Sequence, residues 1–260
     1  MRWSYSDLQK WIISGCDIKI IEDITELDIS NNSLKYIPKE VFLLENLIRF
    51  DCNENKINHI SKHIKYLKKL EYFDCCYNNL SYIPIEINYL TKLKYLDCKL
   101  NKLEDISHLY LPKLKYLNCS YNSIKQMYDF YQLEIYKCSS NMITQITPNI
   151  KNYVNLIYFD CSYNMIKDIP SDIQFLTQLK TFIIKFNRLS TIPSEISELK
   201  NLKYLYVSNN SITHLPEELL NLQLEYFDCS NNSMSKEYVK YIKSLNINKY
   251  PWTITFGNPT

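Results

Sequence analysis

The chain has 260 residues, 46% of them hydrophobic, and a net charge of +2, which suits one large domain or two small ones. Acidic and basic residues are interspersed along its length, so composition argues against nucleic acid and an anionic membrane as partners. Charges interrupt the first residues, no apolar run reaches membrane-spanning length, and the nine cysteines are an odd number, so we expect a cytoplasmic protein with reduced thiols.

Residues 1–23 are predicted to form an N-terminal helical cap. Ser6-Asp7-Leu8-Gln9 is typical of a capping box, Leu8, Trp11 and Ile12 make one apolar stripe, and Gly15 can end the helix.

Residues 24–234 repeat one pattern ten times, from ITELDISNNSL at 24–34 through LEYFDCCYNNL at 70–80 to LEYFDCSNNSM at 224–234. The asparagine before the last apolar residue recurs every 19 to 23 residues, at Asn32, Asn55, Asn78, Asn101, Asn122, Asn141, Asn164, Asn187, Asn210 and Asn232. We expect this side chain to bond the backbone of a buried turn, so that successive asparagines form a ladder.

Each unit is predicted to begin with a short strand whose alternate residues face opposite ways. In the third unit Leu70, Phe73, Cys75, Leu80 and Ile83 then belong to the core, while Tyr72, Asp74 and Cys76 face outward. In five units a proline can begin a short helical or 3₁₀ return segment, at Pro38, Pro84, Pro170, Pro193 and Pro216.

The motif L-x-x-L-x-L-x-x-N-x-L, at this period and over this span, resembles the leucine-rich repeat family. The proline turns are similar to its 23-residue intracellular class. The resemblance implies an α/β solenoid, a curved right-handed horseshoe with a concave parallel sheet of about ten strands and short helices or 3₁₀ turns on the convex side. The chain has no alanine, only two glycines and abundant asparagine, isoleucine and lysine, a skew that follows AT-rich codons. With this composition it also resembles repeat proteins of large DNA viruses that infect amoebae, which would place the protein in the host cytoplasm; an AT-rich protist is the alternative source.

Residues 235–260 are predicted to form a C-terminal helical cap. Tyr238, Ile242 and Leu245 make its apolar stripe, and Trp252 completes it.

The core-facing slot that follows the aspartate column holds cysteine in seven units and isoleucine or valine in the others. This exchange favours buried thiols that act as small hydrophobes, and no metal is expected. Cys76 lies outside that slot, so we expect it to be the thiol most open to modification.

The outward columns are the predicted partner-binding face. One carries Asp28, Asp51, Asp74, Asp97 and Asp160, the next carries Tyr72, Tyr95, Tyr158 and Tyr204, and apolar residues replace the acids near the carboxyl end, at Ile183, Phe186 and Tyr206. Repulsion between neighbouring aspartates is small if the stripe stays solvated. The aspartates either accept hydrogen bonds from neighbouring hydroxyls or bind a basic surface of a partner. The recurrence of tyrosine in this column is explained either by recognition of a partner or by the β-propensity of tyrosine together with codon bias.

No catalytic residue and no cofactor is predicted, since the histidines fall on separate turns and only two glycines are present. We therefore predict a monomeric, non-enzymatic module that binds a protein on its concave face through Asp28, Asp51, Tyr72, Asp74, Tyr95, Asp97, Tyr158, Asp160, Ile183, Phe186, Tyr204 and Tyr206. The alternative is a structural or virion-associated component without a selective ligand.

Overall fold

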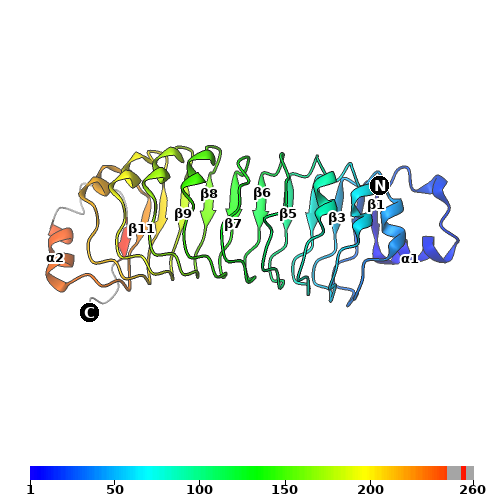
Figure 1. Cartoon of the computed structure of the whole chain (residues 1–260), viewed down its shortest axis with the longest axis horizontal. Coiled ribbons are helices and arrows are strands. Elements are labelled where there is room, and N and C mark those ends of the chain that lie inside the picture. Colours follow the sequence, from blue (N-terminus) through cyan, green and yellow to red (C-terminus); the bar gives the residue numbers. More distant parts are fainter. Residues whose placement is uncertain (245–252, 256–260) are drawn as a thin grey trace. The chain divides into compact units, whose positions relative to one another are not determined.

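The computed structural model describes residues 1–244 and 253–255 (Figure 1). The chain forms two compact units, Met1–Ile124 and Lys125–Thr260. Each unit is a stack of strand–turn–return repeats, as a leucine-rich repeat solenoid requires. In the described part of the chain no helix is both long and apolar enough to span a bilayer.

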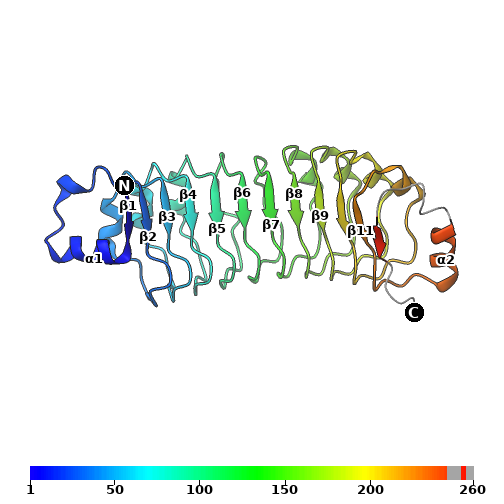
Figure 2. The ribbon, with the colours of Figure 1, turned by 180° about the vertical axis from the view of Figure 1, so that it is seen from behind.

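Unit 1 contains six parallel strands that pair in chain order (Figure 2). They are β1 (Arg2–Ser4), β2 (Glu26–Asp28), β3 (Arg49–Asp51), β4 (Tyr72–Asp74), β5 (Tyr95–Asp97) and β6 (Tyr116–Asn118). Its helices are α1 (Tyr5–Ile13) and the 3₁₀ turns η1 (Ile18–Ile20), η2 (Lys39–Leu43), η3 (Lys62–Tyr66) and η4 (Ile85–Tyr89).

Unit 2 has the same construction. Its parallel strands are β7 (Ile135–Lys137), β8 (Tyr158–Asp160), β9 (Thr181–Ile183), β10 (Tyr204–Tyr206), β11 (Tyr226–Asp228) and β12 (Thr253–Thr255). Its helices are η5 (Pro148–Asn152), η6 (Ser171–Phe175), η7 (Ser194–Glu198), η8 (Glu217–Asn221) and α2 (Lys236–Ser244).

The predicted core of the third repeat is confirmed, because Leu70, Phe73, Cys75, Leu80 and Ile83 are all buried. Aromatic rings at the middle strand position stack between neighbouring repeats: the centroids of Phe50 and Phe73 are 5.5 Å apart, and those of Phe159 and Phe182 are 5.4 Å apart. Burying each such side chain contributes about 1.5–3 kcal/mol, so the inward column is a main source of stability in both units.

The asparagine ladder is also confirmed, and it connects neighbouring repeats. The Asn78 amide donates to the carbonyl oxygens of Cys75 and Cys76 in its own turn and to that of Cys52 in the preceding repeat. Its Oδ1 accepts the backbone N–H of Ile57, also in the preceding repeat. One side chain thereby satisfies groups that the fold buries away from water.

The residue before each ladder asparagine has a positive φ although none is glycine, as at Glu54 (50°), Tyr77 (51°) and Phe186 (53°). This left-handed residue turns the chain from the strand into the next segment, and the asparagine's bonds hold it there.

The five predicted prolines each stand immediately before a 3₁₀ turn, at its N-cap. The predicted capping box was misplaced: α1 begins at Tyr5, and its box joins Ser4 to Asp7. Leu8 and Trp11 are buried and Gly15 follows the helix end with φ 97°. Sequence reasoning missed β1 before this helix and β12 near the carboxyl end. The predicted Leu245 and Trp252 lie outside the described residues.

Candidate functional site

The outward side of the strands, here called the sheet face, carries the predicted site residues. In unit 1 the last positions of β2 to β5 hold Asp28, Asp51, Asp74 and Asp97, here called the aspartate row, and the strand register pairs each with the next. This arrangement is the one predicted.

Every member of the row has a local structural task. Its Oδ1 accepts the backbone N–H of the residue two positions later, at 3.0 Å for Ser30 and for Cys76, 3.2 Å for Asn53 and 2.9 Å for Lys99. Asn118 repeats this bond without a charge, toward Ser120. The aspartate therefore bonds the first residue of the turn that follows the strand, a reason for its recurrence that needs no partner.

The expectation of a solvated stripe is wrong for Asp74 and Asp97, each only 7% exposed. Burial raises the pKa of Asp97, and burial together with the charges of Asp74 and Asp28 raises the pKa of Asp51 to about 6. At Asp28 burial also opposes ionisation, but bonds from Ser30 and from Arg2, whose guanidinium lies 2.9 Å away, outweigh it and lower the pKa. As the pH falls, Asp28 therefore keeps its negative charge longer than Asp51 and Asp97 do.

Beside the row, Tyr72, Tyr95 and Tyr116 form a tyrosine stack. Ring centroids are 4.0 Å apart between the first two and 4.1 Å between the last two, with nearly parallel planes. The guanidinium carbon of Arg49 lies 3.4 Å from the Tyr72 centroid, and its Nη2 is 3.6 Å from Asp51. Burial raises the pKa of Tyr95, and that of Tyr116 to about 12, so both hydroxyls stay protonated.

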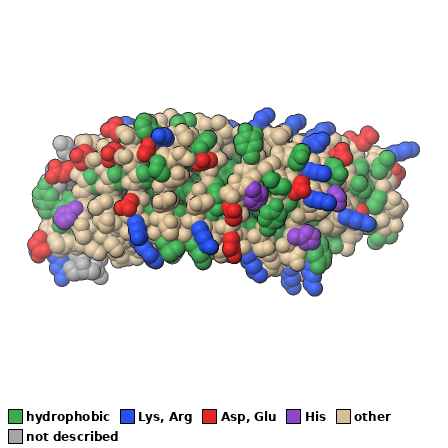
Figure 3. Space-filling model, viewed as in Figure 1, with side chains coloured by type: hydrophobic (Ala, Val, Ile, Leu, Met, Phe, Trp, Pro, Cys, Tyr) green, Lys and Arg blue, Asp and Glu red, His purple; other side chains and the backbone are tan. Residues whose placement is uncertain are grey.

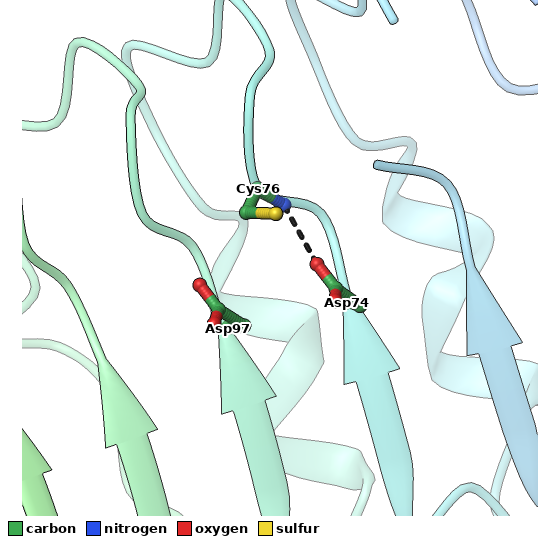
Figure 4. A group of neighbouring side chains, drawn as sticks. All are labelled: Asp74, Cys76 and Asp97. Carbon is green, nitrogen blue, oxygen red and sulfur yellow. Dashed lines mark hydrogen bonds between the residues drawn. The ribbon is translucent and has the colours of Figure 1, made fainter. Parts of the chain in front are cut away.

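Asp74, Cys76 and Asp97 converge where β4 and β5 end (Figure 4), with one possible ligand atom of each within 4.8 Å of the others. Sequence reasoning placed Asp74 and Cys76 on one side but missed their meeting with Asp97. Both carboxylates already accept backbone N–H bonds, and burial followed by the Asp74 charge raises the pKa of the Cys76 thiol. A cation there would have to displace a firmly held proton, so we assign no metal.

The other thiols follow the prediction. Cys52, Cys75, Cys98, Cys119, Cys138, Cys161 and Cys229 are buried. The sulfurs of Cys52 and Cys75 each lie 3.3 Å from a carbonyl oxygen of the following strand. Cys76, which was expected to be exposed, is half-buried, and burial followed by the Asp74 charge raises its pKa, against the expectation that it is the most reactive thiol.

Unit 2 presents a different sheet face. Asp160 and Asp228 keep the turn bond, each also accepting a serine hydroxyl at 2.6 Å. Between them Ile183 and Tyr206 occupy the aspartate position and are register partners on β9 and β10. We call these two, with the exposed Tyr204, the apolar row. Tyr158 stands at the Tyr204 position on β8, next to Thr181.

Phe186 does not lie on a strand with the rest of the predicted patch. It occupies the left-handed position of the turn after β9 and stacks on Tyr163 of the preceding repeat, with centroids 4.2 Å apart. Its ring therefore belongs to the edge where the turns stack.

A family model described as "Leucine rich repeat" matches residues 22–80 and 177–234, and one described as "Leucine Rich repeats (2 copies)" matches residues 68–111. No curated protein sequence matches this chain.

Several solved structures are similar. The functional domain of InlJ from Listeria monocytogenes, which includes a cysteine ladder, is 27% identical with a TM-score of 0.73, covering 84% of this chain and 47% of its own. The ectodomain of the receptor kinase GASSHO1/SCHENGEN3 from Arabidopsis thaliana, in complex with CASPARIAN STRIP INTEGRITY FACTOR 2, is 24% identical with a TM-score of 0.73, covering 84% of this chain and 28% of its own. YopM from Yersinia enterocolitica is 23% identical with a TM-score of 0.66, covering 90% and 46%. The chain thus spans less than half the length of each.

Proposed function

This chain belongs to the leucine-rich repeat family, and from that premise we propose that it binds a protein partner on its sheet face, as a monomer and without catalysing a reaction. Proteins of this family are generally protein-interaction modules, and the GASSHO1/SCHENGEN3 ectodomain is in complex with CASPARIAN STRIP INTEGRITY FACTOR 2. We propose the cytoplasm as its location, where free thiols persist.

The observation that carries the proposal is the apolar row. At this position aspartate closes the turn after the strand, as it does at Asp160 and Asp228 in the same unit. Ile183 and Tyr206 have no carboxylate to make that bond, and they place apolar surface on the outside instead. Because the fold favours the acid, a contact with another protein is the simpler reason for the replacement.

The aspartate row and the tyrosine stack are the weaker part of the proposed surface. Their side chains already bond to one another and to the backbone. We propose that they form a separate contact on unit 1, weaker than that of the apolar row on unit 2, with Arg49 and the half-exposed tyrosines offering hydrogen bonds and ring edges to the partner.

The test is affinity capture from native cells with the double variant Ile183→Asp/Tyr206→Asp. Aspartate restores the turn bond, so folding should be kept, while binding of a stoichiometric partner should fall at least about tenfold. Phe175→Asp, an exposed site on η6 of the same unit, is the matched control and should retain the partner.

Chemical crosslinks from Lys185, between β9 and Phe186, should join the partner to the wild-type chain. Capture that is equal for wild type and the double variant would contradict the proposal. If no lysate yields a partner, the alternative of a structural component without a selective ligand would replace it.

A further inference from the structure

A cavity of about 490 Å³ lies between η2 and η3 of unit 1. Phe42, Leu43 and Tyr66 supply its apolar wall, and Lys39, His63 and Cys16 line the rest, together with the carboxylate of Glu40. We call it the η2–η3 cavity. All its residues belong to unit 1. They lie on the return segments η2 and η3 and at Cys16 after α1, whereas the proposed contact uses the last positions of the strands.

The cavity has a local structural origin. η3 packs closely against η4, whereas η2 touches η3 more sparingly. Ahead of η2, the chain leaves α1 through Gly15 and Cys16, both with positive φ, and no equivalent five-residue turn precedes η2 in the described residues. The first return segments are therefore less tightly stacked than those that follow.

Large apolar side chains remain exposed around the cavity. Leu43 is 49% exposed and Tyr66 is 43% exposed. The His63 ring is also exposed, and its centroid lies 5.9 Å from the Tyr66 ring in a stacked arrangement and 6.1 Å from the ring of the buried Phe42. Such a hollow can accept an aromatic or aliphatic side chain.

The segment that contains η3, on one side of this hollow, is rich in lysine. Between Glu54 and Glu71 the sequence has Lys56, Lys62, Lys65, Lys68 and Lys69 and no acidic residue. In the described part of the chain Lys39, Lys62 and Lys68 make no ion pair, and the Lys65 ammonium lies 5.4 Å from the Tyr66 ring centroid. On the face shown in Figure 3, Lys, Arg and His side chains gather over the part of the chain coloured blue to cyan in Figure 1.

We propose that the η2–η3 cavity docks an acidic protein segment with one apolar anchor, the anchor entering between Leu43 and Tyr66 and the carboxylates lying on Lys39, Lys62 and Lys65. A single apolar hollow with an interrupted basic rim suits such a segment. A nucleic acid would need a continuous track of cations, and Glu40 in the lining interrupts the track here. A short peptide can place its carboxylates on the lysines and away from Glu40. This surface differs in place and in preferred charge from the sheet face.

The test uses two short fluorescein-labelled peptides of glutamate and serine, one with a central phenylalanine and one with serine in its place. Fluorescence anisotropy should show the phenylalanine peptide binding about tenfold more tightly, because only it fills the hollow. Leu43→Gln and Lys62→Glu/Lys65→Glu should each weaken its binding about tenfold. All three positions are at least partly exposed, so these variants should fold.

The matched controls lie in unit 2. Phe175 ends η6 as Leu43 ends η2, and Lys167 is an exposed lysine, so Phe175→Gln and Lys167→Glu should bind like wild type. Alkylation of Cys16 should also slow when the peptide is bound.

Equal affinity for both peptides, or binding that survives both cavity variants, would overturn the proposal. So would a single-stranded RNA or phosphatidylserine vesicles binding more tightly than the phenylalanine peptide. The outcome is separate from that of the sheet-face proposal, since these variants leave β9 and β10 unchanged.

Discussion

The two units have the same repeat architecture but carry different side chains on the sheet face. In unit 1 the last strand position carries four aspartates and Asn118, each bonding the turn that follows, and the neighbouring position carries three stacked tyrosines. In unit 2 Asp160 and Asp228 keep the acid on β8 and β11, but β9 and β10 carry Ile183 and Tyr206 at the same position, and Thr181 interrupts the tyrosines. Comparing the same strand positions in the two units shows which residues the repeat fold requires and which can be replaced without loss of the fold.

What the units share should have the largest effect on stability. Asn78→Ala and Asn164→Ala each remove four bonds to buried backbone groups. Each should lower the free energy of unfolding by about 3 kcal/mol, measured by urea unfolding followed by circular dichroism. Asn79→Ala is the control, since its side chain makes no such bonds. A loss in one unit that is several-fold smaller would show that the repeats are not equivalent.

Replacing a tyrosine of the outward tyrosine column by alanine should lower the free energy of unfolding more in unit 1 than in unit 2. Tyr95 is stacked on both faces by tyrosine rings, whereas Tyr158 has Ile135 and Thr181 as register partners and the Lys137 ammonium 5.3 Å from its ring centroid. Tyr95→Ala should therefore cost about 2 kcal/mol of unfolding free energy and Tyr158→Ala about 1 kcal/mol. Equal losses in urea unfolding would mean that the stack adds nothing beyond burial.

The aspartate row should make stability depend on pH in two directions. The folded pKa of Asp51 is raised to about 6, above the unfolded value, because burial and the charges of Asp74 and Asp28 outweigh Arg49 and the Asn53 N–H. Its ionisation therefore destabilises the fold as pH rises from about 4 to 6, by about 1–2 kcal/mol after solvent screening. The folded pKa of Asp28 is lowered, so its contribution is lost below about pH 4.

Urea unfolding at a series of pH values checks both signs. Asp51→Asn should remove the decline in stability between pH 4 and 6, and Asp28→Asn should remove part of the loss at lower pH. If Asp51→Asn leaves the slope between pH 4 and 6 unchanged, the carboxylate is better solvated than its position indicates.

The smallest effect concerns the thiols. Cys16 and Cys76 are both half-buried, but the Cys76 pKa is raised and its thiolate fraction is correspondingly small. In the folded protein, iodoacetamide at pH 8 should label Cys16 at least about tenfold faster than Cys76, and the buried cysteines more slowly still. Peptide mass spectrometry gives these rates. Faster labelling of Cys76 would restore the original expectation.

The sequence predicted the repeat frame, the core slots, the asparagine ladder and the prolines before the return segments, because each depends on a period that ten copies display. It did not predict β1, β12 or the true start of α1. Each of these elements occurs only once, so no repeated pattern reveals it. Strand pairing also depends on contacts between residues far apart in the sequence, such as Arg2 and Glu26, and no local pattern predicts them.

The site was predicted in outline. The face of each outward residue followed from strand alternation, but the burial of Asp74 and Asp97 did not, since burial depends on how neighbouring repeats pack and not on the alternation within one strand. Phe186 was misplaced because the turn's left-handed residue breaks the alternation after β9. The η2–η3 cavity was missed, although the lysine run at 56–69 and the exposed Leu43 and Tyr66 at matching places were visible signals.

The direction of the asparagine ladder has a consequence for synthesis. The turn of one repeat is held by the side chain of the next: Oδ1 of Asn55 accepts the N–H groups of Asn32 and Leu34, and its amide donates to the Ile29 carbonyl. Each repeat leaving the ribosome therefore stays open until the following asparagine has emerged. Folding during translation should advance from the amino end and lag the growing chain by one repeat.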